Sequence, residues 1–213
     1  SALPMLAPSA GASPSSMPPL PSVTKAFILA CVGAFCFFEL FPALKLWFVL
    51  WPLNSGLFMP WQLLSYAFLH GGFEHLLFNM LGLWMFGGEL ERVWGPKRYT
   101  QMLVARTLSA AAAQLLFTWL MGAQSPTVGA SGAIFGLLLS FGMLFPNRII
   151  VPLIPPIPMK AKYFVAIFGA LELILGARLF NFGPPNVAHF AHLGGMLGAW
   201  LLIRHWRSPR RRG

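Results

Sequence analysis

Long apolar segments follow one another through most of this chain, with little charge between them. They cover residues 26–44, 73–86, 99–122, 131–144, 161–179 and 187–203. Only 9% of the 213 residues are charged, whereas a soluble domain carries about 25%. Apolar segments of this kind are typical of membrane spans. We therefore expect an all-α, polytopic membrane protein with six transmembrane helices, a long first loop at residues 45–72 and a short, recessed fourth helix.

Composition divides the chain into three parts. Residues 1–24 are rich in proline and serine and carry no charged side chain, which predicts a disordered N-terminal tail. Residues 25–206 hold the apolar segments and form the expected membrane domain, and residues 207–213 form a basic cytoplasmic tail. The first part lacks the features of a signal or transit peptide, so we expect the first apolar segment to direct insertion.

The distribution of basic residues predicts the topology. The net charge is +10, but the basic residues lie in short loops and the tail, which favours a topological signal over nucleic-acid binding. The loops at 123–130 and 181–186 hold no basic residue. By the positive-inside rule, both termini are then expected in the cytoplasm. Twelve of the fifteen basic residues fall on that side: Lys25, Arg92, Lys97, Arg98, Arg148, Lys160, Lys162, Arg204, Arg207, Arg210, Arg211 and Arg212.

The fourth apolar segment begins with a serine between glycines, Gly129-Ala130-Ser131-Gly132. The 14 residues from 131 to 144 span about 21 Å as a helix, against an apolar core of about 30 Å. We therefore expect Ser131 at a helix N-terminus, at the floor of a wet pocket, where backbone N–H groups favour negative charge. Taken alone, the motif is more typical of close helix packing than of a nucleophile.

A nucleophilic serine needs a base, and the sequence contains no aspartate. His189 and His192 lie near the start of the last apolar segment, at the same expected depth as Ser131. Two GxxxG spacings, one in each segment, allow these helices to approach closely. Either imidazole could therefore reach the serine.

His75 and Asn79 are four residues apart and share one face of the second apolar helix. They could stabilise a tetrahedral oxyanion, although such pairs more often bond between helices. The histidines lack an HExxH zinc motif, so we expect no metal and no cofactor.

Three motifs together carry a resemblance: His70-x4-His75-x3-Asn79, the GASG run at 129–132 and the AHLGG run at 191–195. In order and spacing, residues 25–206 resemble the rhomboid intramembrane serine proteases of the bacterial type. The resemblance implies a six-helix rhomboid-like bundle with Ser131 as nucleophile and His192 as general base.

The same resemblance assigns the supporting residues. His75, Asn79 and the Ser131 backbone N–H would form the oxyanion hole, and His70 would be structural. Phe135, where family members often carry tyrosine, would pack on the His192 ring. The supporting set is His70, Gly129, Gly132 and Phe135.

Three residues depart from this pattern or lack an explanation in it. The family's Trp-Arg pair in the first loop is here Trp61-Gln62, which is expected to weaken anchoring of the loop or its contact with lipid. Arg106 and Glu172 fall within apolar segments, where Arg106 is expected to reach the interface or a partner.

The function predicted from this resemblance is an intramembrane serine endopeptidase that cleaves transmembrane segments of other proteins with a Ser-His dyad. Its partners would be transmembrane substrates and the lipid bilayer, not nucleic acid, and its location the inner membrane of a bacterium, with the active site open to the outer side. A non-catalytic rhomboid-like adaptor is the alternative. A small transporter is disfavoured because no internal repeat is visible.

Overall fold

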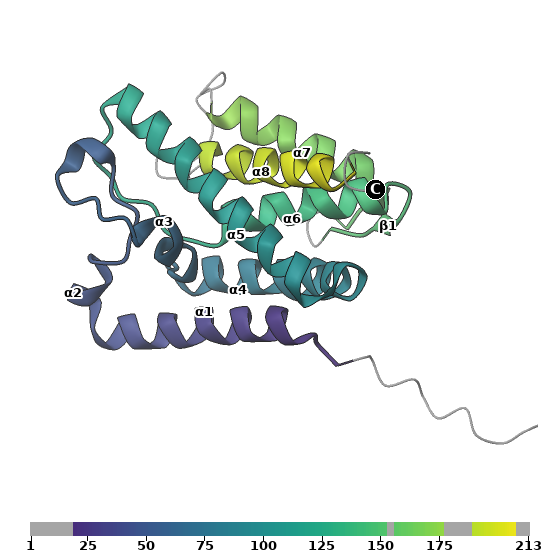
Figure 1. The fold of residues 1–213 in the computed structure, drawn as a ribbon, viewed down its shortest axis with the longest axis horizontal. Coiled ribbons are helices and arrows are strands. Elements are labelled where there is room, and N and C mark those ends of the chain that lie inside the picture. Colours follow the sequence, from purple (N-terminus) through teal and green to yellow (C-terminus); the bar gives the residue numbers. More distant parts are fainter. Residues whose placement is uncertain (1–18, 153–155, 177–188, 208–213) are drawn as a thin grey trace, which may run out of the picture.

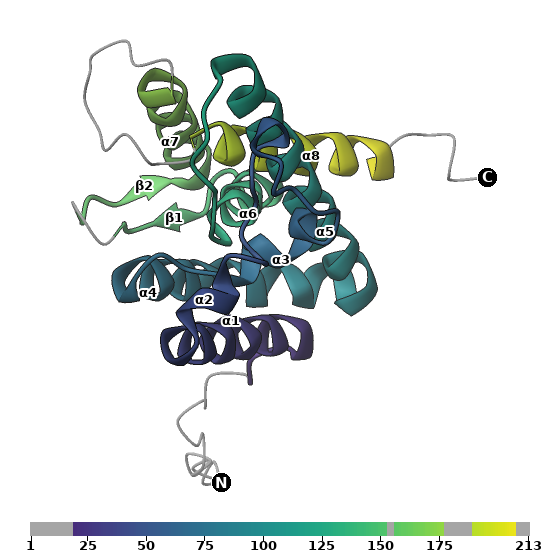
Figure 2. The same ribbon diagram turned by 90° about the vertical axis from the view of Figure 1, so that its left-hand side faces the viewer.

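A computed structural model describes residues 19–152, 156–176 and 189–207. The described chain is mostly helical, as predicted, and its helices form one bundle (Figures 1 and 2). Most of the two predicted tails lies outside the described residues, as does the side chain of Glu172. The helices of the bundle are α1 (Ser22–Leu40), α4 (Phe73–Gly82), α5 (Gly88–Met121), α6 (Ser131–Leu144), α7 (Ala161–Gly176) and α8 (His189–Arg207).

The remaining elements are short. They are α2 (Pro42–Lys45), the 3-10 turns η1 (Leu53–Ser55) and η2 (Tyr66–Phe68), α3 (Gln62–Ser65), the π-helical turn η3 (Leu83–Gly87), and strands β1 (Ile149–Ile150) and β2 (Met159–Lys160). The two strands pair antiparallel and form a hairpin between α6 and α7. Figure 1 shows α2 and α3 at one end of the bundle and β1 at the other.

Two helical stretches are long and apolar enough to cross a membrane, Ser22–Leu40 and Phe73–Met121. Ser131–Leu144 and Ala161–Leu171 are apolar but shorter. The second stretch contains a break at Gly95, whose φ of 75° and ψ of 164° are not helical, followed by Pro96. It therefore comprises two helical segments, 73–94 and 96–121, and the number of spans stays a prediction.

The N-terminus of α1 is fixed by a side chain from α5. The carboxylate of Glu91 accepts hydrogen bonds from the backbone N–H of Val23 at 2.9 Å, and from the N–H and Oγ1 of Thr24, both at 2.7 Å. A carboxylate at this position satisfies N–H groups that have no partner within the helix and opposes the positive end of the helix dipole. As a result α1 begins at Ser22, inside the segment predicted to be a tail.

Glycines bring α8 against α5 and α6. A β-carbon on Gly132 would lie 2.6 Å from Ala110 Cβ and 3.0 Å from the carbonyl oxygen of Ala191. A β-carbon on Gly195 would collide with the carbonyl oxygen of Gly132. The close approach predicted from the glycine spacings is thus present, and Ser109 Oγ adds a 2.7 Å hydrogen bond to the carbonyl of Gly194.

Arg106 does not reach the interface. Its side chain is fully buried, and its Nε donates to the carbonyl of Met102 at 3.1 Å. The aliphatic part lies against Gly136, where a β-carbon would lie 2.7 Å from Arg106 Cγ. The other two guanidinium nitrogens have no hydrogen-bond partner among the described residues. Of the two expected outcomes, the structure therefore shows burial with a backbone partner.

Candidate active site

Ser131 is the first residue of α6, and the segment before it is held by the first loop. Leu50 and Thr127 form an isolated β-bridge with two backbone hydrogen bonds of 2.9 Å. The N–H of Gly129 donates to the carbonyl of Tyr66 at 3.0 Å. Gly129 has a φ of +119°, which favours glycine because other residues rarely adopt it. These contacts fix the direction from which the chain enters α6.

The Ser131 hydroxyl lies 2.8 Å from His192 Nε2, within hydrogen-bond distance. The imidazole comes from the first turns of α8 and is buried, with 6% of the side chain exposed. Phe135, one turn along α6, stacks on it with ring centroids 4.3 Å apart and planes at 12°. His189 is the other candidate from the sequence; its ring stands edge-on to His192 at 6.3 Å. The geometry therefore pairs Ser131 with His192.

His75 approaches the same serine from α4. A β-carbon on Gly129 would lie 2.7 Å from His75 Nε2 and 3.7 Å from Ser131 Oγ, so both groups border the same face of Gly129. The backbone N–H of Gly71 donates to His75 Nδ1 at 3.4 Å. Because Nδ1 accepts this bond, the proton of a neutral imidazole lies on Nε2. His75 thus presents an N–H toward Gly129 and Ser131.

Asn79 lies one turn further along α4 and is buried, with 6% exposed. Its Nδ2 has no hydrogen-bond partner among the described residues. A buried amide donor without a partner is costly, and such groups in native structures call for an explanation. The helix that carries it packs on α6, since a β-carbon on Gly82 would lie 3.1 Å from Ile134 Cγ2.

His70 lies in the first loop, directly before α4. It is 1% exposed, and its ring meets the His75 ring edge-to-face at 5.1 Å. Burial lowers the pKa of His70 from its ordinary value of 6.5 to about 4, so the ring is neutral at pH 7. Neither ring nitrogen has a hydrogen-bond partner among the described residues. His70 therefore contacts the candidate site through its packing on the His75 ring.

Two first-loop residues, Lys45 and Gln62, make contacts that the sequence does not predict. Lys45 Nζ donates to the carbonyl of His70 at 2.6 Å. Gln62 is 1% exposed, and its amide bonds the backbone of Trp51, Trp47 and Leu57 at 3.2, 3.4 and 3.1 Å. The loop is thus fastened by the glutamine that stands where the family carries arginine. No sequence signal identifies these contacts, because they join residues of an irregular loop.

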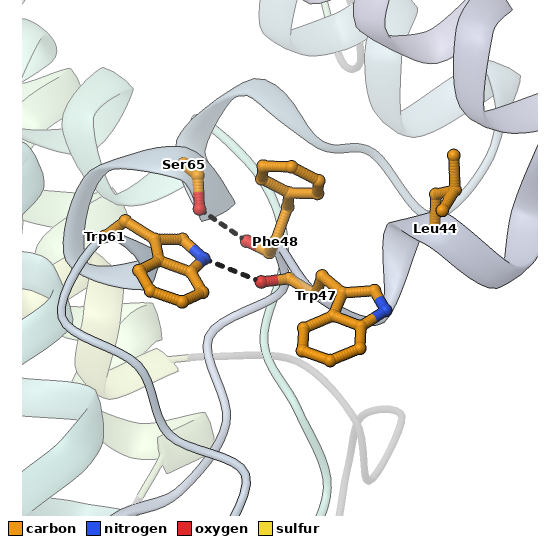
Figure 3. A pocket seen from close by; sticks show the side chains of 5 residues that line it. All are labelled: Leu44, Trp47, Phe48, Trp61 and Ser65. Atoms are coloured by element: carbon orange, nitrogen blue, oxygen red, sulfur yellow. Dashed lines mark hydrogen bonds between the residues drawn. The ribbon is translucent and has the colours of Figure 1, made fainter.

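An aromatic pocket of about 480 Å³ lies on the same loop, and neither Ser131 nor His192 lines it. Figure 3 shows its two internal hydrogen bonds, from Trp61 Nε1 to the carbonyl of Trp47 at 2.9 Å and from Ser65 Oγ to the carbonyl of Phe48 at 2.7 Å. These bonds satisfy the polar side-chain atoms of Trp61 and Ser65. Its walls are formed by Leu44, Trp47, Phe48, Trp61 and Ser65.

The model of the rhomboid domain matches residues 57–207. The chain belongs to the rhomboid family. This is a family of membrane-integral, intramembrane proteases, so the prediction of a helical membrane protein is confirmed.

Three rhomboid relatives illustrate the extent of the similarity. The chain is 32% identical to the rhomboid protease GluP of Bacillus subtilis (strain 168), over 70% of this chain and 27% of that protein. It is 32% identical to the putative rhomboid protease YdcA of the same strain, over 67% of this chain and 65% of that protein. It is 28% identical to the rhomboid protease GlpG of Yersinia pestis (strain Pestoides F), over 73% of this chain and 51% of that protein. The chain therefore spans between about a quarter and two thirds of the length of these rhomboids.

Proposed function

We propose that this rhomboid is an intramembrane serine endopeptidase that cleaves transmembrane segments of other membrane proteins with a Ser131–His192 dyad. The observation that carries the proposal is the 2.8 Å contact between Ser131 Oγ and His192 Nε2. A histidine at this distance can remove the hydroxyl proton as the serine attacks.

The Phe135 ring supports this assignment of the base. In a triad, an aspartate holds the imidazole in its working orientation. This chain has no aspartate, but stacking at 4.3 Å and 12° restricts rotation of the His192 ring. The stack can therefore orient the His192 imidazole without a carboxylate. A dyad requires such an alternative because it has no third member.

The reaction would proceed in two stages. His192 takes the Ser131 proton, and Oγ attacks the scissile carbonyl to form a tetrahedral intermediate. His75 Nε2–H, the Asn79 amide and the Ser131 N–H would donate to its oxyanion. His192 then protonates the leaving amine, and a water molecule hydrolyses the acyl-enzyme. A helical substrate must unwind locally, because its carbonyls are otherwise hydrogen-bonded.

The proposed topology has six spans over residues 25–206, with both termini in the cytoplasm and the site open to the outer side of a bacterial inner membrane. The distribution of basic residues supports this orientation. At the bundle end where β1 lies, basic residues outnumber acids, whereas the first loop at the opposite end carries Lys45 alone.

The test uses the purified chain with a fluorogenic transmembrane peptide that has small residues at the cleavage position. Ser131→Ala and His192→Ala are expected to lower kcat by more than about a thousandfold. Asn79→Ala should lower it by about a hundredfold, through loss of one oxyanion donor. A fluorophosphonate probe should label the wild type and not Ser131→Ala. Undiminished cleavage by Ser131→Ala would refute the proposal, whereas a folded wild type inert to peptide and probe would favour the adaptor.

A further inference from the structure

The peptide group between His70 and Gly71 is hydrogen-bonded at both ends. Its carbonyl oxygen accepts from Lys45 Nζ at 2.6 Å. Its N–H, which belongs to Gly71, donates to His75 Nδ1 at 3.4 Å. A single peptide group therefore lies between an ammonium ion and an imidazole of the candidate oxyanion hole.

A peptide group in this position is polarised by the charge on its oxygen. Hydrogen bonds to an ionised donor are roughly twice as strong as neutral ones, and consecutive bonds strengthen one another cooperatively. Lys45 thus makes the Gly71 N–H a better donor to Nδ1. A better donor at Nδ1 holds the imidazole proton on Nε2, the nitrogen that borders Gly129 and Ser131.

In the described part of the chain, the ammonium group of Lys45 forms no salt bridge with a carboxylate. Glu89 pairs with Arg148 at 2.8 Å, and Glu91 caps α1. Glu39 and Glu74 are exposed and form no salt bridge with it. Lys45 itself is only partly exposed, at the end of α2. It also precedes residues 57–207, the range that the rhomboid domain matches.

We propose that Lys45 is a positioning residue of the oxyanion hole, acting through the His70–Gly71 peptide to fix the tautomer and orientation of His75. The inference rests on the proposed protease function, because it assigns a role within the same site. Lys45 does not touch the substrate; it determines which nitrogen of His75 can donate to the oxyanion.

The experiment compares Lys45→Met, which keeps length and loses charge, with Lys45→Arg, which restores a cationic donor. Lys160→Met is the matched control, since Lys160 is exposed on the β1–β2 hairpin. For Lys45→Met, kcat toward the fluorogenic transmembrane peptide should fall about tenfold, which corresponds to about 1.4 kcal/mol of lost transition-state stabilisation. KM should change little, because the bond matters most in the transition state. Lys45→Arg should recover most of the rate, and Lys160→Met should match the wild type.

A second measurement reports on the imidazole directly and does not need activity. In protein labelled with ¹⁵N-histidine, the His75 resonances, assigned by their loss in His75→Asn, should show an Nε2–H tautomer in the wild type. In Lys45→Met they should show a mixture of tautomers. An unchanged kcat and an unchanged His75 tautomer in Lys45→Met would overturn the inference while leaving the dyad intact. If Ser131→Ala cleaves as fast as the wild type, the protease proposal fails instead, and the tautomer alone decides the role of Lys45.

Discussion

At the scale of single residues, the candidate site is built from imidazoles whose surroundings differ. His70 is the clearest case, because it is 1% exposed and burial lowers its pKa to about 4. The spacing of His75 and Asn79 predicts that they share one helix face, and the resemblance to rhomboids assigns His70 a structural role. The sequence could not predict that His70 is a packed neutral ring, because its environment comes from residues of an irregular loop.

The lowered pKa of His70 predicts how stability depends on pH. Below pH 6.5 the unfolded chain binds a proton at this residue that the folded chain binds only near pH 4. The contribution of the neutral His70 ring to the free energy of unfolding is therefore fully present above pH 6.5. It is lost as the pH falls to about 4, and the loss amounts to at most about 3 kcal/mol. Thermal unfolding in detergent at pH 7.5 and pH 4.5 should show a smaller loss of Tm for His70→Gln than for the wild type. His205→Gln, at an exposed position on α8, is the control, and equal losses in all three proteins would contradict the expectation.

At the scale of elements, apolar segments predicted some helix boundaries well and others poorly. The sequence predicts a helix over residues 131–144, and α6 has these bounds. It separates two spans at 73–86 and 99–122, whereas helical structure continues through both and breaks at Gly95. The end of an apolar segment marks the expected membrane boundary. It does not mark the end of the helix, which continues for as long as its backbone hydrogen bonds can form. The start of α1 depends on Glu91, 67 residues away from its partner Thr24, which no local pattern shows.

The contact between α6 and α8 predicts a sharp effect of one methyl group. In Gly195→Ala the new carbon would meet the carbonyl oxygen of Gly132, a backbone atom one residue from Ser131. Relief requires the two helices to separate, which typically costs about 1–3 kcal/mol and lengthens the contact between Ser131 and His192. We expect a lower Tm and loss of fluorophosphonate labelling. Gly33→Ala on α1, where nothing lies within 4 Å, should keep both properties, and a fully labelled Gly195→Ala would show that the helices need not touch.

At the scale of the whole molecule, the first loop contacts the segment before Ser131 and the segment before α4, and so supports the serine from two sides. Its Leu50 pairs with Thr127, its Tyr66 carbonyl holds Gly129, and its Lys45 holds the peptide next to His75. The sequence predicted a long first loop but not this supporting role, since contacts between two irregular segments leave no periodic pattern. The class of helical membrane protein was predictable because hydropathy reports on the membrane, whereas the contacts of the loop were not.

The proposed orientation gives the last prediction, which matched asparagines can test. Asn54 lies in the first loop and Asn147 lies directly before the hairpin at the opposite end of the bundle, and both are exposed. In a background with Cys31→Ala and Cys36→Ala, each would be changed to cysteine and treated in intact cells with a membrane-impermeant maleimide. The positive-inside rule predicts labelling of Asn54→Cys alone, and labelling of Asn147→Cys only after the membrane is permeabilised. Labelling of Asn147→Cys in intact cells would invert the topology and would place Ser131 on the cytoplasmic side, where water would reach the acyl-enzyme from the cell interior.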